Sequence, residues 1–159
     1  MTDGDEVLLR YLVRGSELLL PEARSPARTD GLWMTTCFEM FVMPEGDDEA
    51  YFEFNFSPSA RWAAYAFNGY RAAMRDLTVS VAPHIDPAPP AEPEDGDPHY
   101  LLEAEVDFSE IPASALRIGL TAVIEELDGT KSFWALAHPS PEPDFHNAAG
   151  FVLELPAAG

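Results

Sequence analysis

The residues whose types and spacing could do chemistry begin in the segment 51–57. Three phenylalanines alternate there with Tyr51, Glu53, Asn55 and Ser57. Successive side chains of a β-strand point to opposite faces, so this alternation predicts a strand with one aromatic face and one polar face. A polar face on a rigid apolar support can present hydrogen-bonding groups to a ligand. The alternative interpretation is a solvated sheet face on which Glu53 and Asn55 bind nothing.

A second carboxylate, Glu39, stands one expected strand earlier among apolar neighbours. Trp33, Cys37 and Phe41 share its parity in that segment. If Glu39 and Glu53 face the same side of a sheet, they lie close together with aromatic rings around them. Two carboxyl groups in one pocket could act as a glycosidase pair, provided that their separation is right.

Aromatic and basic residues near these segments could complete a ligand site. Flat rings pack against the C–H face of a sugar and attract cations, and an arginine donates hydrogen bonds. The alternative is that each large ring belongs to the core of a small sandwich. The residues concerned are Trp33, Trp62, Tyr65, Tyr70, Arg71 and Trp134.

The segment 134–147 runs into a proline-rich loop that carries His138, Asp144 and His146. Loops on a rigid scaffold often carry function, and two histidines with an aspartate could ligate a divalent metal. No further ligand stands at a spacing diagnostic of zinc, so we predict no metal site there. His138 would then satisfy backbone groups and Asp144 would cap a turn. The acid-rich turn 45–49 could hold calcium, although a solvated turn is the simpler interpretation.

Period-two patterns predict the elements that must position these residues. About ten short strands separated by turn residues are typical of a sandwich, with hairpin turns expected at 14–16, 68–69 and 128–129. A helix over 60–75 is the alternative to two strands, but the Asn-Gly break favours strands. The expected strands are 7–13, 17–20, 32–43, 51–57, 61–67, 70–75, 78–82, 99–108, 116–127, 131–137 and 151–155.

The segment 83–98 holds six prolines and five acidic residues. Proline cannot donate to a sheet ladder, so we expect a surface loop here and not a domain boundary. With 159 residues, 47% of them hydrophobic, the chain is expected to form a single domain, 1–159. The predicted fold class is all-β, a two-sheet antiparallel β-sandwich.

The charge balance limits the classes of partner. The chain has 28 acidic and 9 basic residues, a formal net charge of −19. Nucleic acids and anionic membranes are not expected as partners, because both are bound largely through Lys and Arg. A neutral or cationic small molecule suits the field better, although the acid excess could serve solubility alone.

Other sequence features indicate compartment and catalytic class. A single cysteine, Cys37, excludes an intramolecular disulfide. The acidic segment 1–6 is unlike a secretory signal, and no apolar run approaches the ~20 residues of a membrane span, so we expect a soluble, cytoplasmic protein. Phosphate-loop, His-Glu-x-x-His, Cys-x-x-Cys and Gly-x-Ser-x-Gly motifs are absent, which favours a function without catalysis.

A set of motifs carries a family resemblance. It comprises Leu32-Trp33, Glu39-Met40-Phe41, the segment 51–58, Trp62, 65–71, 134–138 and 143–146. These motifs resemble those of a bacterial DOMON-like family, which is similar to the family 9 carbohydrate-binding modules and to haem- or sugar-binding DOMON domains. The resemblance extends over about Val7–Leu155, and its most specific part is Glu-Phe-Asn-x-Ser-Pro at 53–58.

The resemblance implies an immunoglobulin-like or jelly-roll sandwich with a ligand site on one sheet. The implied function is the binding of a small molecule, a carbohydrate or sugar derivative, without catalysis. The residues expected to bind it are Trp33, Glu39, Glu53, Asn55, Trp62, Tyr65, Arg71, Trp134, His138 and His146.

A haem- or metal-binding DOMON-like domain is one alternative, and haem-binding relatives use a methionine and a histidine as axial ligands. Met34, Met40 or Met43 could pair with His138 or His146. The related sugar- and haem-binding domains are generally secreted or periplasmic, whereas this chain shows no signal segment. The sequence specifies no cofactor.

Two further alternatives remain. One is a sugar-acting enzyme that uses Glu39 and Glu53, which would require both carboxyl groups in one pocket with at least one pKa shifted by burial. The other is a protein-interaction domain that uses a sheet face or edge. The ligand and the oligomeric state are not specified by the sequence.

Overall fold

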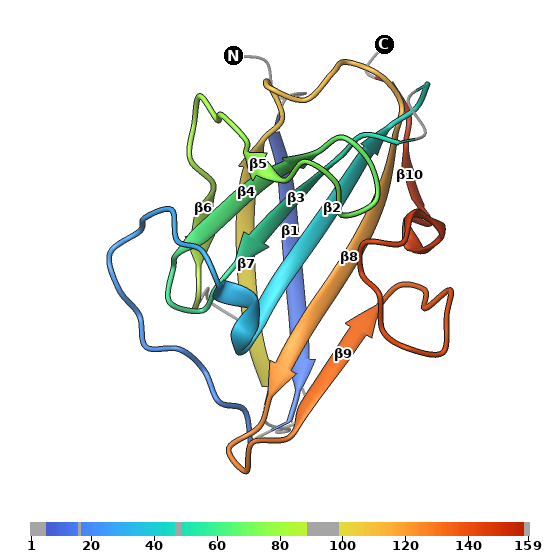
Figure 1. Ribbon diagram of the computed structural model, residues 1–159. Coiled ribbons are helices and arrows are strands. Elements are labelled where there is room, and N and C mark those ends of the chain that lie inside the picture. Colours follow the sequence, from blue (N-terminus) through green and yellow to red (C-terminus); the bar gives the residue numbers. More distant parts are fainter. Residues whose placement is uncertain (1–5, 16, 47–48, 89–98, 158–159) are drawn as a thin grey trace.

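The computed structural model describes residues 6–15, 17–46, 49–88 and 99–157. These residues form ten strands in two antiparallel sheets and no α-helix, which confirms the predicted β-sandwich (Figure 1). The smaller sheet has the order β1-β7-β6, and the larger has the order β10-β8-β2-β3-β4-β5, with β9 also paired to β8. The strands are β1 (Glu6–Arg14), β2 (Cys37–Pro44), β3 (Tyr51–Phe56), β4 (Trp62–Phe67), β5 (Arg75–Asp76), β6 (His84–Asp86), β7 (His99–Asp107), β8 (Leu116–Glu125), β9 (Lys131–Ala135) and β10 (Leu153–Leu155).

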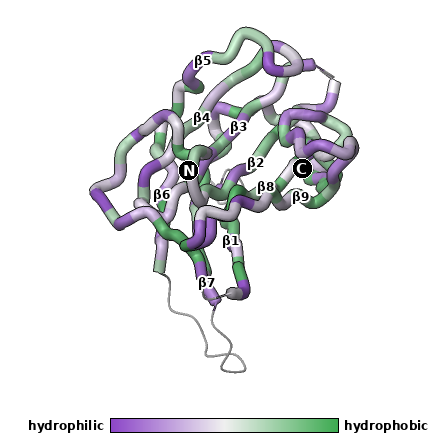
Figure 2. Tube along the Cα trace, turned by 60° about the horizontal axis from the view of Figure 1, so that its bottom comes forward, coloured by the Kyte–Doolittle hydropathy of each residue, from purple (hydrophilic) through white to green (hydrophobic). Residues whose placement is uncertain are grey.

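The main core lies between the two sheets. Figure 2 shows β1, β6 and β7 as a layer separate from the one that contains β2, β3, β4 and β8. Strand alternation sends one side chain in two into the space between them, where burial stabilises each large apolar group by roughly 1.5–3 kcal/mol. The buried side chains include Phe38, Met40, Val42, Phe54, Phe56, Leu102, Val106 and Ile118.

The opposite face of the larger sheet is also covered. All eight residues of β2 are buried, which requires contact on both faces. The pairing of β2 with β3 sets Glu39 opposite Asn55 and Phe41 opposite Glu53, so these four side chains share the outer face. Loops cover this face, with Leu32, Phe145 and Ala148 packed on a second cluster of buried residues: Phe41, Met43, Tyr51, Ala63, Tyr65, Phe67 and Phe151.

The first predicted hairpin is wrong. β1 pairs with β7 over its whole length, from Glu6 opposite Asp107 to Arg14 opposite His99. The segment 17–20 leaves this sheet, and Leu18 makes one isolated bridge to Glu126. A long-range partner with nine matched residues replaces the local one.

Three other segments also differ from the prediction. Residues 32–34 form a 3-10 turn (η2, Leu32–Met34), so the long strand starts only at Cys37. The segment 78–82 forms no strand, whereas β6 lies inside the predicted loop 83–98. Residues 89–98 of that loop lie outside the described residues.

Of the two hairpins predicted after β4 and after β8, the first is only partly correct and the second is confirmed. The chain reverses after β4 over Gly69–Ala72, closed by the Ala72 N–H on the Gly69 carbonyl at 2.9 Å, and so the predicted strand 70–75 shrinks to β5. Arg71 has φ 50° there, a left-handed conformation incompatible with a strand. The Asp128-Gly129 turn is confirmed, since β8 and β9 pair directly across it.

The segment around Phe151 packs closely on the outer face of the larger sheet because Gly119 of β8 has no side chain. A Cβ added at Gly119 would lie 2.7 Å from Cδ1 of Phe151, whose ring stacks on Phe41 at 5.5 Å between centroids. We predict that Gly119→Ala lowers the free energy of unfolding by about 1–3 kcal/mol, because the ring must shift out of a packed cluster. Urea denaturation would measure this.

Gly69→Ala is the matched control, since its added Cβ would lie 3.9 Å from the Cβ of Ala72, an ordinary contact. The double variant Gly119→Ala/Phe151→Leu should recover part of the loss. Equal stabilities for the two alanine variants would contradict the predicted packing.

Candidate ligand-binding site

A cavity of about 550 Å³ lies on the covered outer face of the larger sheet. Its walls come from β2, β3, β4, β8 and β9 and from three loops. The carboxyl groups of two strands share it with a histidine, an arginine and several rings. The lining residues are Trp33, Glu39, Glu53, Tyr65, Phe67, Arg71, Met74, Val123, Phe133, Pro143, Phe145 and His146.

Glu39 and Glu53 are diagonal neighbours on adjacent strands and are only 3% and 5% exposed. Burial, followed by repulsion from Glu53, raises the pKa of Glu39 well above its ordinary value. Burial also raises the pKa of Glu53 to about 7, against opposing effects of Asn55 and Arg71. Near neutral pH the pair therefore holds protons that exposed carboxylates would have lost.

Few donors are available to this pair. The Thr121 hydroxyl donates to Oε1 of Glu39 at 3.4 Å, a long hydrogen bond. The donors nearest the Glu53 carboxyl group are the Asn55 amide, which lowers the pKa of Glu53, and Nε2 of His146 at 3.6 Å, a distance longer than an ordinary hydrogen bond. Asn55 lies fully buried beside the pair, and neither atom of its amide has a hydrogen-bond partner in the described part of the chain. The carboxyl groups of Glu39 and Glu53 at the floor of the cavity can therefore form further hydrogen bonds with a ligand.

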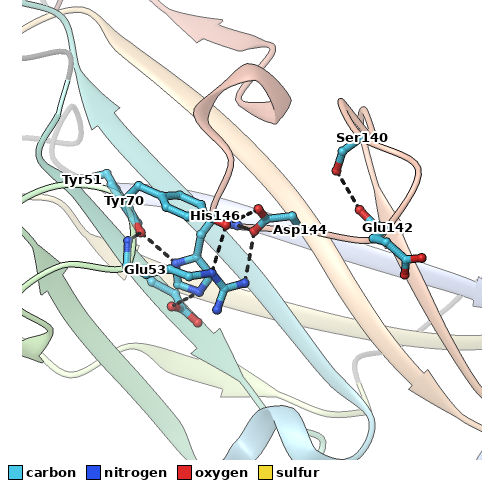
Figure 3. Close-up of polar contacts among 8 residues, drawn as sticks. Tyr51, Glu53, Tyr70, Ser140, Glu142, Asp144 and His146 are labelled. Carbon is cyan, nitrogen blue, oxygen red and sulfur yellow. Dashed lines mark hydrogen bonds and ion pairs between the residues drawn. The ribbon is translucent and has the colours of Figure 1, made fainter.

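His146 lines one side of the cavity and is held there by a hydrogen bond with the Tyr51 hydroxyl (Figure 3). The Tyr51 hydroxyl accepts the Arg71 backbone N–H at 3.1 Å and lies 2.8 Å from Nδ1 of His146. The hydroxyl proton is then free to donate to Nδ1, which leaves the imidazole proton on Nε2. That Nε2 lies 3.6 Å from Oε1 of Glu53.

The imidazole of His146 is held neutral. Its ring packs edge-on against Phe41 and Phe67, at 5.0 and 5.1 Å between centroids. Burial, followed by the positive charge of Arg71, lowers the pKa of His146 to about 4, although Asp144 opposes this. His146 therefore presents an N–H donor to the cavity and no positive charge above about pH 5.

Asp144 in the loop after β9 lies against Tyr70 in the loop after β4 (Figure 3). Together with Arg71, these residues form a clamp that joins the two loops. The Tyr70 hydroxyl and the Arg71 guanidinium each donate to the Asp144 carboxylate, the latter at 3.1 Å. Burial alone would raise the pKa of Asp144, but these two donors hold it below its ordinary value. The Arg71 charge is thus committed to Asp144 at the edge of the cavity.

The loop before β2 is fixed in a similar way. The Tyr65 hydroxyl donates to Oδ1 of Asp30 at 2.6 Å, and burial together with Asp30 raises the pKa of Tyr65. This bond places η2 over the cavity, where Trp33 is 52% exposed. Phe133 of β9, 44% exposed, lines the same cavity, so the mouth has an aromatic rim above an acidic floor.

The structure brings together six of the ten residues predicted from sequence. They are Trp33, Glu39, Glu53, Tyr65, Arg71 and His146. Asn55 lies next to the carboxyl pair but does not line the cavity. The predicted site residues did not include the lining residues Phe67, Met74, Val123, Phe133, Pro143 and Phe145, although the motif segments 65–71 and 143–146 contain three of them. For Phe133, the parity shared with Val123 across the Asp128-Gly129 hairpin is the signal that could have found it.

The other three predicted residues lie elsewhere. Trp62 is buried between the sheets and stacks on the Arg28 guanidinium, 4.5 Å from the ring centroid, because it pairs with Phe56 on the inner face. Trp134 pairs with Ala122, which also directs it to the inner face. His138 stands beside Phe145 but does not line the cavity.

Trp134 lines a second, larger groove of about 1060 Å³ between β1 and the strands β8, β9 and β10. Its walls are mainly aliphatic, with exposed Leu8, Leu12 and Leu136 among them. Polar groups do not converge there as they do around Glu39 and Glu53. The carboxyl-lined cavity is therefore the better candidate for specific recognition of a polar ligand.

Two of the methionines considered as haem ligands, Met40 and Met43, lie on different faces of the larger sheet. No group of three or more His, Cys, Asp or Glu able to hold a metal ion occurs among the described residues. Met40 is buried between the sheets, Met43 is buried in the outer-face cluster, and Met34 is exposed to solvent.

In the described part of the chain no helix has the length and apolarity needed to cross a bilayer.

The fold and the site define an antiparallel β-sandwich with a covered, carboxyl-lined cavity on the outer face of its larger sheet. Among solved structures, the chain is similar to a candidate carbohydrate-binding protein from Bacteroides uniformis, with a TM-score of 0.64 at 18% identity. The match covers 93% of this chain and 72% of that chain, and at this identity it shows the fold alone. No family model matches the chain, and no curated protein matches it.

The raised pKa of Glu53 predicts a pH-dependent stability. The folded state binds this proton more tightly than the unfolded state, so the contribution of Glu53 to stability falls as pH rises from about 4.5 through 7. We predict that Glu53→Gln, which cannot ionise, raises the free energy of unfolding at pH 8 by up to roughly 3 kcal/mol. The gain should vanish near pH 4, as chemical denaturation at both pH values would show.

Glu154→Gln is the control, because Glu154 is exposed on β10 and should give the same small effect at both pH values. A Glu53→Gln variant equally or less stable than the parent at pH 8 would contradict the description of Glu53 as a desolvated carboxyl group.

Proposed function

We propose that this protein binds a small polar molecule, a carbohydrate or sugar derivative, in the cavity above Glu39 and Glu53, and that it does so without catalysis. The observation that carries the proposal is the convergence of buried hydrogen-bonding groups under an aromatic rim. Sugars have that same combination of polar edges and apolar C–H faces. The cavity volume of about 550 Å³ lies within the range of small-molecule sites.

Two further observations support the proposal. The solved structure with a similar fold is that of a candidate carbohydrate-binding protein. The motifs that resemble the DOMON-like family include Leu32-Trp33, Glu39-Met40-Phe41 and Pro143–His146, which contribute Trp33, Glu39, Phe145 and His146 to the cavity. Membership of the DOMON-like family is therefore part of what we propose.

The rim gives a direct test, because the chain has one exposed tryptophan on each side of the larger sheet. Trp33 lines the cavity and is 52% exposed, whereas Trp134 is 62% exposed and lines the other groove. We predict that Trp33→Ala weakens sugar binding about five- to tenfold through loss of stacking, roughly 1–1.4 kcal/mol, whereas Trp134→Ala leaves affinity unchanged.

A glycan and sugar-derivative array followed by calorimetry of the hits would measure these affinities. The absence of any sugar ligand would contradict the proposed function. Equal losses in the two tryptophan variants would place binding outside the cavity.

A second candidate function is glycoside hydrolysis, favoured by the position of Glu39 and Glu53 in one cavity with raised pKa values. A carboxyl group that stays protonated near neutral pH can act as a general acid beside a second carboxylate. In that case Glu39→Gln and Glu53→Gln should each lower aryl-glycoside hydrolysis by about 100-fold or more, and Glu154→Gln should not. No turnover by the parent protein on a broad glycoside panel would exclude this candidate.

A further inference from the structure

We propose that the group that enters the cavity deepest is a protonated amine, held by Glu39 and Glu53, so that the ligand class is amino sugars or comparable polyhydroxylated amines. This inference rests on the proposed function and narrows it. Acidic groups outnumber basic groups among the residues that line the cavity. Two carboxyl groups lie at its floor, and the cation among its described lining residues, Arg71, is bound to Asp144.

The carboxyl pair lacks a positive partner of its own. Arg71 donates to Asp144 and Tyr70 and lies at the cavity edge, with its side chain 55% exposed. His146 faces Glu53 at 3.6 Å, yet burial keeps the imidazole neutral. A buried carboxylate without a countercharge is costly, and a ligand cation removes that cost.

The hydrogen-bonding capacity of the floor also fits an ammonium group. Glu53 is about 95% buried and lines the cavity, and its nearby donors are the Asn55 amide, which lowers its pKa, and Nε2 of His146, which is 3.6 Å away. Glu39 accepts only the long Thr121 bond. An ammonium has three donors and no acceptor, which matches ionised carboxyl groups on adjacent strands better than a hydroxyl does, because a carboxylate only accepts.

The aromatic walls of the cavity and the net charge of the protein also favour a positively charged ligand. Tyr65, Phe67 and Phe145 line the cavity together with Trp33 and Phe133, and aromatic faces attract cations, most strongly where water is excluded. The net charge of −19 draws cations toward the protein. The polyhydroxylated part of the ligand would then lie between Trp33 and Phe133 at the rim.

The decisive measurement compares three forms of the same sugar. Hexosamines, their N-acetyl derivatives and the parent hexoses, in several configurations, differ at one substituent. Calorimetry with the full-length protein at pH 6.5 should give at least tenfold tighter binding of one hexosamine than of its N-acetyl or parent form. Glu53→Gln should reduce that preference at least tenfold, and Glu154→Gln should leave it unchanged.

Proton release gives a second readout on the unaltered protein. An ammonium needs at least one of the two carboxyl groups ionised, so binding at pH 6 should expel protons, seen as a dependence of the binding heat on the buffer's ionisation enthalpy. The titratable and charged groups that interact with the carboxyl pair are Cys37, Tyr51, Tyr65, Arg71 and His146 from the cavity side and Tyr11 from the inner face of the sheet. Burial keeps the pKa of the tyrosines and of the thiol above their ordinary values and that of His146 near 4, so these groups do not titrate near pH 6.

The outcomes separate the inference from the proposed function. Hexoses or N-acetyl sugars that bind as tightly as hexosamines, without proton release, would overturn the amine assignment and leave the proposed sugar site intact. Failure of all three forms would count against both. Hexosamine binding that survives Glu53→Gln without loss of preference would also overturn the assignment.

Discussion

The burial of two carboxyl groups on the outer face of the larger sheet is the constraint on which the site depends. Strand alternation alone puts Glu39 and Glu53 on that face. Desolvating a carboxylate is unfavourable, so the cover over them must be held by other interactions. The second cluster of buried aromatic side chains supplies these, with Phe151 stacked on Phe41 and packed against Gly119.

Specific polar contacts then fix the cover relative to the sheet. Asp30 binds Tyr65 on one side of the cavity, and His146 binds Tyr51 on the other. Arg71 takes part twice, because its left-handed φ of 50° lets the backbone N–H meet the Tyr51 hydroxyl while its guanidinium reaches Asp144. Backbone strain of this kind persists where the surrounding contacts determine the conformation.

Local patterns in the sequence were sufficient for several of the strands and for one hairpin. The alternation in 51–57 and 99–108 and the Asp-Gly turn at 128–129 depend on neighbouring residues, and the corresponding elements formed. The hairpin expected at 14–16 failed because β1 takes β7 as its partner, more than 80 residues away in the chain. Pairing at that distance leaves no local signal.

The site was predictable only in part for the same reason. Parity identified which residues of a strand share a face, and so linked Glu39 to Glu53. It could not show that the polar face would be covered, since the cover comes from segments before β2 and after β9. Nor could parity within 131–137 show which of Phe133 and Trp134 faces the cavity, because that depends on the register of β9 on β8.

The opposite pKa shifts of Glu53 and His146 have one physical origin. Desolvation disfavours whichever form carries charge, so it keeps the carboxyl protonated to about pH 7 and the imidazole unprotonated to about pH 4. An ion pair between them would have balanced the cavity internally and left no reason to attract a cation. The Tyr51 hydroxyl opposes that pair, because it donates to Nδ1 only while the imidazole is neutral. Near neutral pH the carboxyl pair is therefore neutralised by protons and not by a cation of the protein, and in the proposed binding mode a ligand ammonium takes the place of those protons.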